Sequence, residues 1–117
     1  MTFNLDGRQF RPVKNSAEGR VTSDAVFTFT QDAQSFHAHY EGEGFSDGHL
    51  IGVFVDEETA KLIYHCRAED GSLEAGEANA VFSTAETGKI KIKMNWHWLN
   101  GSGASGTSEY IEISPAA

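Results

Sequence analysis

Cysteine is almost absent from the chain: Cys66 is the only one among 117 residues. A single cysteine cannot form an intramolecular disulfide, and it excludes a structural zinc site built from four cysteines. The chain also lacks an apolar run near the roughly 20 residues that span a bilayer. No early segment has the pattern of a secretory signal. We therefore expect a cytoplasmic protein that is not inserted in a membrane.

Basic residues are scarce as well. Nine lysines and arginines stand against 17 aspartates and glutamates, which gives a formal net charge of -8. Positive potential supplies most of the non-specific affinity for nucleic-acid phosphates and attracts proteins to anionic membranes. The composition therefore argues against nucleic acids and membrane surfaces as partners. A net charge far from zero keeps a protein soluble, and this role is sufficient to explain the excess of acidic residues.

Helical periodicity is missing, whereas period-two alternation recurs along the chain. The clearest example is the sequence Lys-Ile-Lys-Ile-Lys-Met-Asn-Trp-His-Trp at residues 89–98, where polar and apolar residues alternate without a break. Such alternation puts one kind of side chain on each face of a strand. Further strands are predicted at residues 8–13, 25–31, 35–41, 47–55, 61–67, 73–82 and 108–113. Pro12 cannot donate to a sheet, so the first strand should be an edge or end there.

Short strands joined mostly by tight turns favour one all-β domain over residues 1–117, a length that supports a single core. An antiparallel meander of this size closes well, because closure removes the exposed edges. We therefore predict an eight-stranded antiparallel up-and-down barrel, wide enough to be filled by side chains or to hold one small ligand. The predicted inward residues are Phe27, Phe29, Phe36, Tyr40, Leu50, Leu62, Tyr64, Cys66, Ile90, Ile92, Met94, Trp96 and Trp98.

Aromatic side chains dominate this interior, and two interpretations of them stay open. They either fill the core, since each buries roughly 150–250 Å², or line a pocket for a small apolar or aromatic ligand. Tyr64 and Trp98 carry polar tips that need partners inside the barrel. The candidate ligand-binding residues are therefore Tyr40, Tyr64, Trp96 and Trp98. No cofactor is expected.

Two histidines form the sharpest candidate for metal chemistry. His37 and His39 stand two apart on a predicted strand, so they point the same way, roughly 7 Å apart, which suits joint ligation. Glu43 follows with the spacing of a cupin motif, but Gln31 stands where that motif has glycine. Because the residues that alternate with the histidines are apolar, we expect both imidazoles on the solvent face. We therefore expect no metal site; a metal-dependent enzyme using His37, His39 and Glu43 is the alternative.

Aliphatic residues are predicted on the outer face of two neighbouring strands. These are Ile51, Val53, Val55 and Ile63, which we call the aliphatic patch. Contiguous exposed aliphatic side chains usually mark an interface, and two-fold dimers are the commonest closed assembly. We therefore predict a homodimer through the aliphatic patch.

Six short pieces of the chain together carry a family resemblance. They are Asn-Leu-Asp-Gly-Arg-Gln-Phe-Arg at 4–11, Gly-His-Leu-Ile-Gly at 48–52, Tyr-His at 64–65, Gly-Lys-Ile at 88–90, Trp-His-Trp at 96–98 and Gly-Thr-Ser-Glu-Tyr-Ile-Glu at 106–112. The chain resembles a small family of bacterial proteins that are often labelled automatically as N-acetylglutamate synthase. The resemblance implies a compact β fold, here a calycin- or streptavidin-like barrel, with unknown function.

The acetyltransferase label does not fit these residues. Acetyl-CoA-dependent N-acetyltransferases carry an Arg/Gln-x-x-Gly-x-Gly/Ala turn that opens a helix, whose amides hold the pyrophosphate. The sequence contains neither the turn nor the helix, so we assign no catalytic residue. The predicted function is non-catalytic binding of a small apolar or aromatic ligand. A metal-dependent enzyme and a purely structural or interaction domain are the alternatives.

Overall fold

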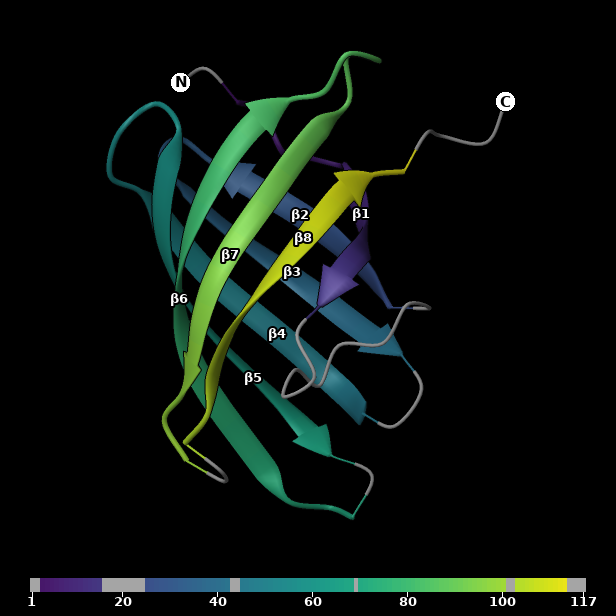
Figure 1. Ribbon diagram of the computed structural model, residues 1–117, viewed down its shortest axis with the longest axis vertical. Helices are drawn as coiled ribbons and strands as arrows, with labels where there is room; N and C mark the ends of the chain where they lie inside the picture. Colours follow the sequence, from purple (N-terminus) through teal and green to yellow (C-terminus); the bar gives the residue numbers. More distant parts are fainter. Residues whose placement is uncertain (1–2, 16–24, 43–44, 69, 101–102, 114–117) are drawn as a thin grey trace.

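The chain forms a closed antiparallel β-barrel in the computed structural model, which describes residues 3–15, 25–42, 45–68, 70–100 and 103–113 (Figure 1). Each strand pairs with the next, and β8 pairs with β1. The strands are β1 (Gln9–Asn15), β2 (Val26–Asp32), β3 (Ser35–Gly42), β4 (Phe45–Phe54), β5 (Thr59–Ala68), β6 (Leu73–Thr84), β7 (Ile90–Trp98) and β8 (Ser105–Glu112). In Figure 1, β6 to β8 cross in front of β2 to β5 with the opposite tilt, as barrel closure requires. The predicted barrel is confirmed.

Most strands lie within two residues of their predicted bounds, and two strands differ in ways that matter for the fold. β8 begins at Ser105, earlier than expected, because its first residues continue the ladder with β7. β1 runs through Pro12 instead of ending there. It pairs with β2 at Gln9 and Phe10, and its pairing with β8 shifts register between Pro12 and Lys14. The irregularity accommodates a residue that has no N–H to donate, because proline is tolerated at bulges.

Side chains alternate between the barrel interior and solvent. The alternation is unbroken over all nine residues of β7. Every predicted inward residue is buried, Cys66 among them. Aromatic rings fill much of the interior: the Phe36 ring lies within 6.0 Å, centroid to centroid, of the rings of Phe29, Phe54 and Phe82. The predicted core is therefore confirmed.

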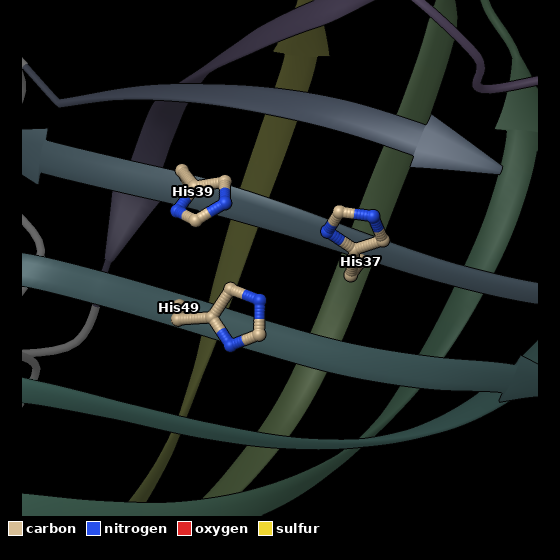
Figure 2. Close-up of side chains that lie close together, drawn as sticks. All are labelled: His37, His39 and His49. Carbon is tan, nitrogen blue, oxygen red and sulfur yellow. The ribbon is translucent and has the colours of Figure 1, made fainter.

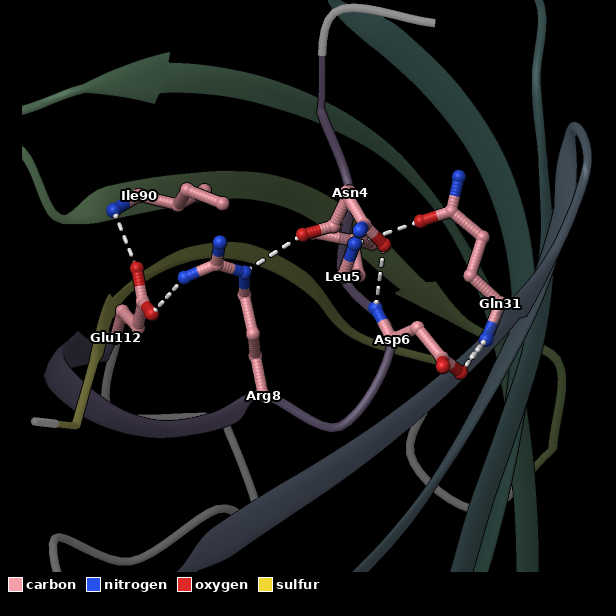
Figure 3. A network of polar contacts seen from close by, with 7 residues as sticks. All are labelled: Asn4, Leu5, Asp6, Arg8, Gln31, Ile90 and Glu112. Atoms are coloured by element: carbon pink, nitrogen blue, oxygen red, sulfur yellow. Dashed lines mark hydrogen bonds and ion pairs between the residues drawn. The ribbon is translucent and has the colours of Figure 1, made fainter. Parts of the chain in front are cut away.

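The segment before β1 covers one end of the barrel, which we call the latched end (Figure 3). Phe3 and Leu5 are buried there, and the Phe3 ring lies 5.8 Å from the ring of Phe82. The Leu5 N–H donates to the Gln31 side-chain oxygen at 2.7 Å. The Gln31 N–H in turn donates to the Asp6 carboxylate at 2.9 Å. These bonds fix the segment to β2.

Arg8 ties the same segment to the last two strands. Its Nε donates to the Asn4 carbonyl at 2.7 Å, and its guanidinium pairs with the Glu112 carboxylate. The other Glu112 oxygen accepts the Ile90 N–H at 3.0 Å. Burial raises the pKa of Glu112, but the Ile90 N–H and Arg8 outweigh that effect and hold it below its usual value. Residues 4–8, which contribute to the family resemblance, therefore have a structural role at the latched end.

Candidate functional site

Three of the four predicted ligand-binding residues lie together toward the opposite end of the barrel, where β5 and β7 end. We call this end the mouth. Tyr64 comes from β5, and Trp96 and Trp98 come from β7. The Tyr64 and Trp98 rings meet edge to face with centroids 5.0 Å apart, and the Trp96 ring lies 6.3 Å from that of Trp98. Strand alternation points all three inward, where each is at least nine-tenths buried.

The Tyr64 hydroxyl is a buried polar group that makes no hydrogen bond of normal geometry with the described residues. Burial raises the pKa of Tyr64, and nearby Tyr110 raises it further, against a lowering by the His97 backbone. The hydroxyl therefore stays neutral and able to donate. Gly76 lies opposite Tyr64 in β6, and a Cβ there would come within 2.4 Å of the hydroxyl oxygen. A buried hydroxyl without a partner costs about 1–3 kcal/mol.

Tyr40, the fourth predicted residue, is held more firmly. Its ring stacks on Phe27 with centroids 4.5 Å apart, and its hydroxyl donates to the His65 carbonyl at 3.2 Å. Burial raises the pKa of Tyr40, and a neighbouring thiol and two neighbouring phenols raise it further. Tyr40 therefore contributes a ring to the interior, while its hydroxyl is already engaged.

A polar pair that was not predicted from the sequence lies in the same interior. The Ser108 hydroxyl donates to the Tyr110 hydroxyl at 2.8 Å, and both residues are buried. Burial raises the pKa of Tyr110 to about 12, against a lowering by Ser108. The alternation of residues 108, 110 and 112 along β8 was the signal that could have found this pair. The interior therefore combines aromatic walls with several hydroxyl groups.

A hollow of about 360 Å³ lies at this end of the barrel, and its lining includes none of the four predicted ligand-binding residues. Its wall includes Cys66, the next inward residue after Tyr64, and Glu74, which pairs with Cys66 across β5 and β6. Both are buried. Arg67 and Asp47 also line the hollow and form an ion pair. The other lining residues are His65, Leu73, Ala75 and Asn100.

The predicted metal candidates lie on the outer wall of the barrel (Figure 2). His37 and His39 point outward, as strand alternation predicted, whereas Glu43 lies outside the described residues. The register adds His49 of β4, which lies opposite His39. One nitrogen from each of the three imidazoles lies within 4.8 Å of the others. His49 was missed because only the β3–β4 register brings it to the pair. The metal-dependent enzyme stays a hypothesis.

The aliphatic patch lies on the outer face of β4 and β5 and the turn between them, as predicted. Ile51, Val53, Val55 and Ile63 are between 44% and 57% exposed. Ile51 lies directly opposite Ile63 across the two strands. A shallow hollow of about 970 Å³ crosses the outer faces of β4 to β8 and includes three of the four residues. The patch is therefore exposed, and Lys61 lies opposite Val53 within it.

The fold and the interior place the chain among small closed β-barrels of the calycin kind. A family model described as "Avidin-like protein" matches residues 3–113, and the chain belongs to this family. No curated protein and no solved structure matched the chain. Among the described residues, no helix is long and apolar enough to cross a membrane. The predicted calycin-like fold is confirmed, while a bacterial origin and an acetyltransferase label stay without support from these findings.

Proposed function

We propose that the protein is a non-catalytic module that binds a small apolar or aromatic ligand at the barrel mouth. Tyr64, Trp96 and Trp98 would surround the ligand, with Tyr40 completing the aromatic wall. Membership of the avidin-like family supports small-ligand binding in general. A cytoplasmic location and the absence of a cofactor belong to the proposal and rest on the sequence.

The unpartnered Tyr64 hydroxyl is the observation that carries this proposal. A folded protein rarely leaves a buried polar group without a hydrogen bond, and the exceptions often have a functional reason. The hydroxyl is neutral and can donate, the Trp98 ring lies against the Tyr64 ring, and the Trp96 ring lies next to that of Trp98. The ligand that fits these groups is a flat or aliphatic molecule carrying one hydrogen-bond acceptor for Tyr64.

Tryptophan fluorescence gives the direct test, because both tryptophans of the chain, Trp96 and Trp98, lie at the proposed site. The full chain is titrated with a panel of small aromatic and heterocyclic compounds, biotin among them. We expect at least one compound to change the emission with saturation. Tyr64→Phe should raise the dissociation constant of that compound about tenfold. The reason is the loss of one hydrogen bond, which contributes about 1.4 kcal/mol.

The matched control is Tyr110→Phe, which removes a hydroxyl that already has a partner in Ser108. This variant should retain most of the affinity. If no compound saturates, or if Tyr64→Phe binds as tightly as the wild type, the mouth is not the ligand site. The barrel would then be a structural or interaction domain.

We also propose that two copies associate through the aliphatic patch. Exposed Ile51 and Ile63 lie side by side, and apolar patches of this kind usually become buried in an interface. Lys61 and Glu77 lie in the same shallow hollow. A two-fold axis can therefore bring Lys61 of one copy against Glu77 of the other, which adds charge complementarity to the apolar contact.

A further inference from the structure

Four of the five histidines of the chain gather on the outer wall of the barrel. The register places His39 of β3 opposite His49 of β4, and His49 opposite His65 of β5. The ring centroids of His39 and His49 are 4.8 Å apart, and those of His37 and His49 are 5.8 Å apart. The rings of His49 and His65 are 5.4 Å apart. We call His37, His39 and His49 the histidine cluster (Figure 2).

The spacing of the histidine cluster is close to what a transition-metal ion requires. Zinc holds imidazole nitrogens at about 2.0–2.1 Å, which puts neighbouring nitrogens of a tetrahedral site roughly 3.4 Å apart. One nitrogen from each histidine already lies within 4.8 Å of the other two. His39 is exposed and His37 is half-buried on the outer face, so rotation of their side chains can close the remaining distance. The pairing of β3 with β4 fixes the backbone positions of the three histidines.

The surroundings of the cluster favour a bound cation. Thr28 and Thr30 of β2 lie opposite the two histidines of β3, and Ile51 of β4 lies opposite one of them. No Lys or Arg occupies these facing positions. The net charge of -8 also attracts cations to the protein.

We propose that His37, His39 and His49 bind one divalent transition-metal ion on the outer face of β3 and β4. Three imidazole nitrogens without an oxygen donor among them favour Zn²⁺, Ni²⁺ or Cu²⁺ over Ca²⁺ and Mg²⁺. Three protein ligands leave a position for water or for a group supplied from outside. The inward neighbours Ala38 and Leu50 are buried, so the barrel wall separates this metal site from the mouth. The two sites can therefore act independently.

The test titrates the full chain, purified without a polyhistidine tag, with Zn²⁺ against a chromophoric zinc indicator. We expect one Zn²⁺ per chain with a dissociation constant of about 10 μM or tighter, and no binding of Ca²⁺ at about 1 mM. His49→Gln should weaken Zn²⁺ binding at least about tenfold, as the loss of a ligand requires. His39→Gln should do the same. His97→Gln, which changes the exposed histidine of β7, should leave the affinity unchanged.

X-ray absorption of the zinc-loaded protein should show imidazole nitrogens in the first coordination shell, and fewer of them in His39→Gln. Circular dichroism verifies that each variant keeps the barrel, which we expect because the altered side chains lie on the outside. Should His49→Gln fail to fold, the exposed His39→Gln variant decides the question. Equal Zn²⁺ affinity in the wild type and His39→Gln would overturn the proposal. Equal weakening by His97→Gln would overturn it as well.

Discussion

The Tyr64 ring lies over Gly76, its cross-strand neighbour in β6, with no space for a side chain between them. A Cβ at Gly76 would come within 2.4 Å of both the terminal ring carbon and the hydroxyl oxygen of Tyr64, and within 2.7 Å of the His97 carbonyl oxygen. The absence of a Cβ at this position therefore determines where the Tyr64 hydroxyl lies. The geometry of the proposed ligand site depends on a residue with no side chain.

Gly76→Ala should consequently lower the free energy of unfolding by about 1–3 kcal/mol, the usual cost of overpacking a well-filled interior. Urea denaturation measures this change. Ser83→Ala, an exposed change in the same strand, should stay within about 0.5 kcal/mol of the wild type. In a Tyr64→Leu background the Gly76→Ala penalty should shrink, because the clashing ring is gone. An unchanged penalty in that background would show that the backbone of β7, and not Tyr64, is the obstacle.

Tyr64→Phe should leave the stability of the ligand-free protein equal to that of the wild type, or raise it by about 1 kcal/mol. The change removes a buried hydroxyl that has no hydrogen bond among the described residues. Tyr110→Phe should instead lower stability by about 1–2 kcal/mol, because the Ser108 hydroxyl loses its acceptor. Thermal denaturation of the two variants compares them directly. Equal destabilisation would indicate that the Tyr64 hydroxyl is satisfied in solution.

The Arg8–Glu112 ion pair should make the barrel sensitive to acid. The pKa of Glu112 in the folded protein lies below its usual value of 4.5. The carboxylate therefore contributes stability that is fully present above pH 4.5 and is lost as the pH falls through the folded-state pKa. Glu112→Gln should destabilise the protein at neutral pH and flatten this part of the pH–stability curve, measured by urea denaturation between pH 3 and pH 7. If the pH–stability curve of Glu112→Gln runs parallel to that of the wild type, Glu112 is not the source of the acid sensitivity.

Ile63→Glu should prevent self-association if the aliphatic patch is a homodimer interface. The wild type is expected to show a dimer mass by light scattering at about 100 μM, since useful dimers persist well below that concentration. Val13→Glu provides the matched control, because Val13 is 49% exposed on β1, outside the patch. It should leave the mass unchanged. A monomeric wild type would contradict the proposal outright.

Local alternation was sufficient to predict most of the fold. It identified the inward face of each strand, including Tyr64, Trp96 and Trp98, and it placed His37 and His39 outside. These predictions hold because a strand's pleat depends only on its own residues. The continuation of β1 through Pro12 was not predicted, because it depends on pairing with the distant β8.

The site required information that local patterns do not contain. His49 joins the histidine cluster only through the β3–β4 register, and the Tyr64 hydroxyl is unpartnered only because of what surrounds it in three dimensions. Register follows from turn geometry and from packing between strands, which the alternation within one strand does not contain. The same limit applies to Glu112, whose partners Arg8 and Ile90 come from the opposite end of the chain and from the preceding strand.

The pairing of β1 with β8 has a consequence for folding speed. Phe10 lies opposite Glu112, so closure joins residues separated by nearly the whole chain. Contacts of such long range are slow to form, because the entropy of ordering the intervening chain is lost before the contact stabilises anything. The six hairpins from β2 to β8 can form first as a curved sheet with two free edges. We therefore expect β1 and β8 to pair late in folding. In stopped-flow measurements, Glu112→Gln should accelerate unfolding far more than it slows folding.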